Sequence, residues 1–114
     1  MNSSPDFRTF SRLGQRATFG QSLFAAAPSF PNLYALSADL GNSSGLDRFK
    51  QRFPDQYLNV GIAEQNMIGF ASGLSTLGLN VFVTSFAPFL TMRACEQVRM
   101  NLSYMRSNVK LVAI

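Results

Sequence analysis

The residue whose type and position suggest chemistry most clearly is Glu64, in the run Gly61-Ile62-Ala63-Glu64-Gln65. The apolar spacing that follows predicts that Glu64 lies in the first turn of a helix. On spacing alone we favour a structural role, in which the carboxylate complements the positive end of the helix dipole. The alternative is a carboxyl group in an apolar pocket, where a raised proton affinity would let it donate a hydrogen bond to a ligand nitrogen.

Two phenylalanines form a second candidate feature. Phe86 and Phe89 flank Pro88, just beyond an apolar strand. Core packing is the more common role for phenylalanine, but a loop offers less structural reason for it, and loops are where binding residues gather. The pair is therefore a candidate platform for a flat ligand.

The other candidates have ordinary structural roles on their own. Asp39 is expected to shape the turn of the Gly-Asn-Ser-Ser loop that follows a strand, and Ser43 is typical of a helix start. Cys95 is predicted to be a small buried residue in the middle of a helix.

Four apolar runs predict the strands that position these loops. The strands cover 33–37, 56–60, 80–86 and 108–114, and the helices cover 15–27, 46–52, 61–77 and 88–104. Strands that alternate with helices form parallel sheets. We therefore predict an α/β fold, a parallel sheet of about four strands with flanking helices. The loops 37–45, 61–65 and 85–89 should converge at the carboxyl edge of that sheet, where such folds bind ligands.

The chain divides into a flexible lead-in over 1–14 and one domain over 15–114. The last predicted strand reaches Ile114 with no binding loop after it, so we expect a truncated domain, incomplete at its C-terminus. Charged residues make up only 14% of the chain, against about 25% in an average domain, and there are 11 phenylalanines. That composition favours a surface that a partner covers.

Composition also excludes several classes of site. With no histidine and one cysteine, the chain cannot build a common zinc site, a histidine-based triad or an internal disulfide. The net charge is +4, and the basic residues are dispersed along the sequence. This distribution is compatible with anionic ligands but is a weak argument for nucleic acid binding. No apolar run is long enough for a membrane span or a secretory signal, so a cytoplasmic location is expected.

Three segments together resemble the pyrimidine-binding domain of the transketolase family: 37–40 (Ser-Ala-Asp-Leu), 53–67, which contains the Gly-Ile-Ala-Glu-Gln motif, and 84–98. The resemblance extends from about Arg16 to Ile114. It is strongest to the separately encoded C-terminal transketolase subunits of prokaryotes and more distant to deoxyxylulose-phosphate synthase. It shifts our interpretation of Glu64 toward function.

The resemblance implies a thiamine diphosphate enzyme that transfers a two-carbon ketol unit between sugar phosphates. The implied roles are as follows: Glu64 hydrogen-bonds N1′ of the aminopyrimidine, Phe89 packs on that ring with Phe86 beside it, Ile62 lines the pocket, Asp39 lies near the cofactor, and Ser43 and Arg93 contact substrate.

The family holds the diphosphate and Mg²⁺ on a separate domain with a Gly-Asp-Gly motif, which this sequence lacks. An N-terminal diphosphate-binding subunit or domain is therefore the expected partner, in a homo- or hetero-oligomer, and the chain alone is expected to be inactive. The alternative is an inactive truncated paralogue that serves as an interaction or assembly module.

Overall fold

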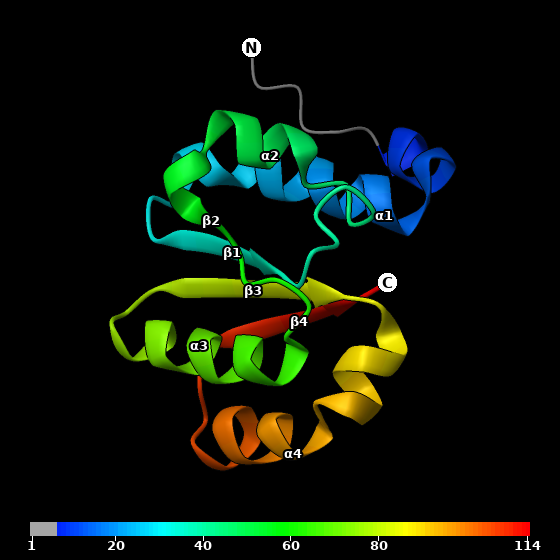
Figure 1. Ribbon diagram of the computed structural model, residues 1–114. Coiled ribbons are helices and arrows are strands. Elements are labelled where there is room, and N and C mark those ends of the chain that lie inside the picture. The colour runs from blue at the N-terminus through cyan, green and yellow to red at the C-terminus, as the bar shows by residue number, and fades with distance from the viewer. Residues whose placement is uncertain (1–6) are drawn as a thin grey trace.

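The computed structural model describes residues 7–114 of the 114-residue chain (Figure 1). The elements, in order, are α1 (Phe7–Ala26), η1 (Ala27–Ser29), β1 (Leu33–Ser37), α2 (Asp47–Arg52), η2 (Pro54–Gln56), β2 (Tyr57–Asn59), α3 (Glu64–Thr76), β3 (Asn80–Ser85), η3 (Phe89–Arg93), α4 (Cys95–Gln97), η4 (Val98–Tyr104) and β4 (Val109–Ala113). Among these residues, no helix is long and apolar enough to cross a membrane.

The four strands form one parallel sheet in the order β2-β1-β3-β4. This confirms the predicted α/β fold with its four-stranded parallel sheet. The connection after β1 leads outward to β2 at one edge of the sheet, and the connection after β3 leads outward to β4 at the other edge. The two connections therefore run in opposite directions from the central strands β1 and β3. Open parallel sheets bind ligands outside the carboxyl ends of their strands at such a point.

Helices cover both faces of the sheet, with α1 and α2 on one face and α3 and the η3–α4–η4 run on the other (Figure 1). Side chains of a strand alternate between the faces, so β1, β2 and β3 each contribute to both cores. One core contains Leu23, Ala27, Leu33, Ala35, Leu46 and Phe49. The other contains Leu36, Ala38, Met67, Ile68, Ala71, Val81, Val83, Leu90 and Ala94.

The predicted lead-in over 1–14 is partly regular. Its first six residues lie outside the described part of the chain, and residues 7–13 are helical and largely exposed. The backbone of Gly14 then leaves the helical region, with φ of 75° and ψ of 166°. Only glycine adopts such a conformation readily, so this residue separates the exposed helical turns from the part of α1 that packs on the sheet.

The helical run after β3 ends at Tyr104 as predicted, but most of it has the wider turns of a π-helix. The amide of Ala94, for example, donates to the carbonyl of Phe89, five residues earlier, at 3.0 Å. The apolar positions Leu90, Ala94, Val98 and Leu102 recur every four residues and all face the core. On an α-helix such a stripe drifts by about 40° per step, and wider turns compensate for that drift.

The prediction that Cys95 is buried is wrong, because its side chain is exposed. Ala94 is the member of the core-facing stripe at this turn, and it is completely buried. The next residue along the helix therefore points away from the sheet.

Candidate functional site

The candidate site begins with Glu64, the first residue of α3. The turn before it contains Gly61, whose φ of 76° is in the left-handed region that favours glycine. That turn brings the chain from β2 directly into the helix. The carboxyl group of Glu64 is only 4% exposed, so it lies in a protein environment where a charge needs a partner.

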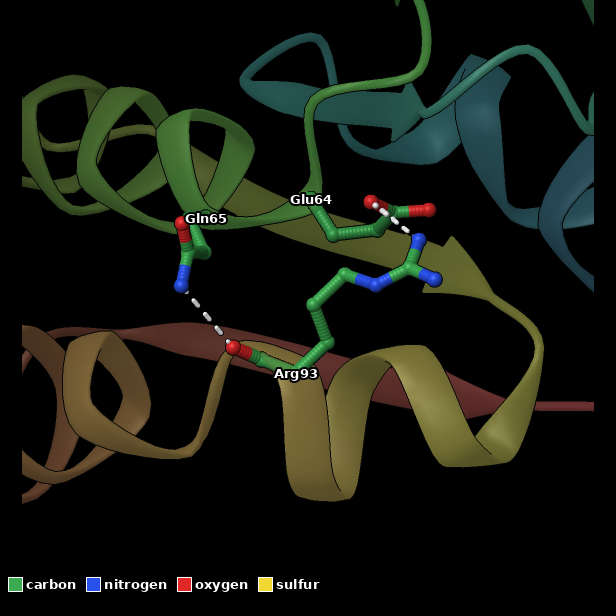
Figure 2. A network of polar contacts seen from close by, with 3 residues as sticks. All are labelled: Glu64, Gln65 and Arg93. Atoms are coloured by element: carbon green, nitrogen blue, oxygen red, sulfur yellow. Dashed lines mark hydrogen bonds and ion pairs between the residues drawn. The ribbon is translucent and has the colours of Figure 1, made fainter.

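Arg93, at the end of η3, supplies that partner in the described part of the chain. Its Nη1 lies 3.3 Å from Oε2 of Glu64 (Figure 2). The guanidinium also lies over the ring of Phe89, with Cζ 4.2 Å from the ring centroid. A second contact fixes the backbone, because Nε2 of Gln65 donates to the carbonyl of Arg93 at 3.0 Å (Figure 2).

The two phenylalanines lie together beside this ion pair. The ring centroids of Phe86 and Phe89 are 6.1 Å apart, and the rings are tilted by 35°. Both side chains are half-buried and belong to neither core cluster. The guanidinium of Arg16 lies 5.6 Å from the Phe86 ring centroid. The rings are thus held at the edge of the sheet with cations against both of them.

Ile62 stands apart from these buried groups. It lies two residues before Glu64, and 78% of its surface is exposed. A large apolar side chain this exposed next to a buried carboxyl is not part of the core of this chain.

Asp39 and Ser43 occupy the neighbouring loop after β1 and do not join the Glu64 cluster directly. They line a polar cavity of ≈ 190 Å³ with Lys50, Tyr57 and Asn59 among its walls. Burial is the main cause that raises the pKa of the Tyr57 phenol, while a hydrogen bond with Ser37 opposes it.

Asn59, which is not among the candidates predicted from the sequence, connects the loop after β1 with the turn before Glu64. Its Oδ1 accepts hydrogen bonds from the backbone amides of Asp39 at 2.9 Å and Gly61 at 3.0 Å, and its Nδ2 donates to Oδ1 of Asp39 at 3.2 Å. The side chain thus clamps the loop after β1 to the turn that presents Glu64. The only available signal was its position, directly before that turn. Arg16 was also missed as a neighbour of Phe86, because the two are distant in sequence.

The arrangement places a buried carboxyl group and an aromatic ring against the same guanidinium. Such a pair suits a flat, nitrogen-containing ring, since the carboxyl can exchange a proton with a ring nitrogen while the ring packs on phenylalanine. Among residues 7–114, no three His, Cys, Asp or Glu side chains gather into a group that could hold a metal ion.

Comparisons with known proteins identify the family of the chain. Residues 12–114 match the family model described as the transketolase, pyrimidine binding domain. A transketolase C-terminal section from Methanocaldococcus jannaschii is 43% identical over 100 residues, covering 88% of this chain and 32% of that protein. The 1-deoxy-D-xylulose-5-phosphate synthase of Alteromonas mediterranea is 40% identical over 96 residues, covering 84% of this chain and 14% of that protein.

A solved structure is similar over most of the chain. It is described as a split gene transketolase, "inactive beta4 tetramer", and matches with a TM-score of 0.80 and 39% identity over 87% of this chain and 33% of that one. The chain thus spans about a third of the length of the first curated relatives that it matches.

Proposed function

This chain belongs to the family of transketolase pyrimidine-binding domains, and on that premise we propose that it forms one wall of a thiamine diphosphate site. The enzyme so formed would transfer a two-carbon ketol unit between sugar phosphates. The observation that carries this proposal is that the buried carboxyl of Glu64 and the ring of Phe89 contact the same guanidinium, within a domain of this family.

The residues present fit the aminopyrimidine half of that cofactor. Thiamine diphosphate, when bound, supplies the carbanion-stabilising chemistry that ketol transfer requires. We propose that the Glu64 carboxyl holds a proton at the ring nitrogen N1′, in a setting that excludes water. Phe89 and Phe86 would orient the ring, and Ile62 would close the pocket once a partner covers it.

The remaining predicted contacts are proposals of the same kind. Asp39 would lie near the cofactor, held by Asn59, and Ser43 would face the substrate from the same polar cavity. Arg93 would contact a sugar phosphate if its guanidinium leaves Glu64. We assign the diphosphate and its Mg²⁺ to a diphosphate-binding partner chain or domain, as the family resemblance implies.

The proposal is tested by assembling the chain with the diphosphate-binding transketolase subunit of the same organism. We expect ketol transfer by the complex, and a loss of at least about 100-fold in turnover for Glu64→Gln, because removing a positioned proton-transfer group costs that much. Glu96→Gln is the matched control, since Glu96 is an exposed acid on α4. Near-normal turnover of Glu64→Gln would refute the role of Glu64.

A second candidate function is an assembly module without catalysis. It is favoured by the solved relative, which is described as an inactive tetramer of one kind of subunit. On this alternative, the chain would form a stable oligomer of its own and bind neither the diphosphate-binding subunit nor the cofactor. Native mass measurement of the chain alone and after mixing distinguishes the two functions.

A further inference from the structure

The guanidinium of Arg93 makes two contacts at the same time, and together they define a small site. Its Nη1 lies 3.3 Å from the Glu64 carboxylate, while its Cζ lies 4.2 Å from the centroid of the Phe89 ring. A flat cation therefore contacts a carboxylate through one of its nitrogens and lies over an aromatic ring. Both contacts are favourable, one as a charge-assisted hydrogen bond and the other as a cation–π interaction.

An aminopyrimidine ring would require the same two contacts. When such a ring is protonated at its ring nitrogen, its N–C–N edge is an amidinium, which is planar and delocalised like a guanidinium. Such a ring would donate an N–H to Glu64 and pack its face on Phe89. The guanidinium and the ring would thus compete for one position.

The Arg93 side chain can move away from Glu64 while the backbone of Arg93 stays in place. The Gln65 amide holds the carbonyl of Arg93 at 3.0 Å, so the main chain stays anchored to α3 whichever way the side chain points (Figure 2). The Arg93 side chain is 50% exposed, whereas that of Glu64 is 4% exposed. The guanidinium can therefore move into solvent, whereas the buried carboxyl remains in place and needs another partner, which a protonated ring would supply.

We propose that the Arg93 guanidinium is an internal occupant of the ring site, displaced when an aminopyrimidine binds, and that Arg93 thereby sets the affinity of the site for its ring. This inference rests on the proposed function, because it takes Glu64 and Phe89 as the ring-binding pair. In the absence of the ring, Arg93 also supplies the partner that a buried carboxylate requires.

The test is a titration with 4-aminopyrimidine of the full 114-residue chain assembled with the diphosphate-binding subunit, monitored by NMR with ¹⁵N-labelled arginine in this chain. In the unaltered chain, the Nε–H signal of Arg93 should move in proportion to the occupancy of the ring. Arg93→Met keeps the apolar stem and removes the guanidinium, so its Kd should fall by about tenfold. Arg93→Lys keeps the charge without the flat face and should give an intermediate Kd.

Arg99→Met is the matched control. Arg99 pairs with Glu96 at 2.8 Å on the same helical run, away from the ring site, so its removal should leave the Kd unchanged. Millimolar guanidinium, far below denaturing concentrations, should weaken ring binding to Arg93→Met and restore the competition that was lost. Folding of each variant is checked from its amide spectrum before the titration.

The possible failures are distinguishable. If Arg93→Met binds the ring as weakly as the unaltered chain, or more weakly, Arg93 does not compete with the ring and the inference is overturned. If the ring binds but the Arg93 signal does not move, the guanidinium and the ring occupy different positions, which overturns the inference as well. If Glu64→Gln binds the ring as well as the unaltered chain, or no chain binds it, the proposed ring site itself fails.

Discussion

Gly20 in α1 packs so closely against Gly45 that a single methyl group should have a large and measurable effect. A Cβ built on Gly20 would lie 2.0 Å from the carbonyl oxygen of Gly45 and 2.7 Å from its carbonyl carbon. Both are backbone atoms, so no side-chain rotation relieves the clash. Gly45 ends the loop that carries Asp39 and Ser43, so the close contact between Gly20 and Gly45 also positions one side of the candidate site.

The change in the free energy of unfolding has two opposing contributions, helix propensity and steric overlap. Replacing glycine by alanine inside a helix gains about 1 kcal/mol in helix propensity. Against this, the backbone must move by about 1 Å to reach even the 3.0 Å that real Cβ contacts respect, and forced overpacking costs about 3 kcal/mol at the upper end of its usual range. We therefore expect Gly20→Ala to lower the free energy of unfolding by about 2 kcal/mol.

Gly73 in α3 is the matched control, since a Cβ built there meets nothing within 4 Å. Gly73→Ala should raise the free energy of unfolding by about 1 kcal/mol, through propensity alone. Urea denaturation of the two variants and the unaltered chain measures both changes, with equal m-values as the check on a common unfolded state. A Gly20→Ala variant as stable as the unaltered chain would refute the close packing of α1 on this loop.

Three further predictions concern the core, the polar cavity and the loop clamp. Phe49 is completely buried between α1, α2 and the sheet, so Phe49→Ala should cost about 3–5 kcal/mol in urea denaturation, whereas Phe30→Ala, at a half-exposed ring, should change little. Burial raises the pKa of Tyr57 above its ordinary value of 10.0, so the folded state favours the neutral phenol. The free energy of unfolding should therefore stay constant below about pH 10 and fall as the pH rises through the folded pKa. Tyr57→Phe should remove that fall. Asn59→Ala deletes three hydrogen bonds and should cost about 1 kcal/mol or more while increasing amide hydrogen exchange at Asp39; unchanged exchange there would argue against the clamp.

The positions of the strands were predictable because each strand is a short apolar run bounded by turn residues. The run at 33–37 corresponds to β1 residue for residue. Boundaries failed where a local backbone conformation decides them. The helix predicted over 61–77 begins only at Glu64, because Gly61 has a positive φ that no helix contains.

The site was predictable only in part, because the sequence pattern identifies side chains one at a time. Glu64 was placed correctly in the first turn of a helix, but its burial depends on how η3 packs against α3. Its pairing with Arg93 joins residues 29 positions apart, and the spacing of charges contains no sign of it. Asn59 was missed for the same reason, since its importance lies in bonds to two separate loops.

In the part of the chain that the structure describes, the residues around Glu64 are unevenly buried, and this bears on how the proposed activity should arise. Glu64 is buried, yet Ile62 beside it is largely exposed and the two phenylalanines are only half-buried. A carboxyl that is to hold a proton at a ring nitrogen requires the ring to be shielded from water on its other face as well. Within residues 7–114, the side chains around Glu64 provide one face of such an enclosure. On the proposed function, catalysis should therefore appear only when a partner surface covers Ile62 and Phe86, and binding of the proposed cofactor should protect the amides of both residues from exchange with solvent.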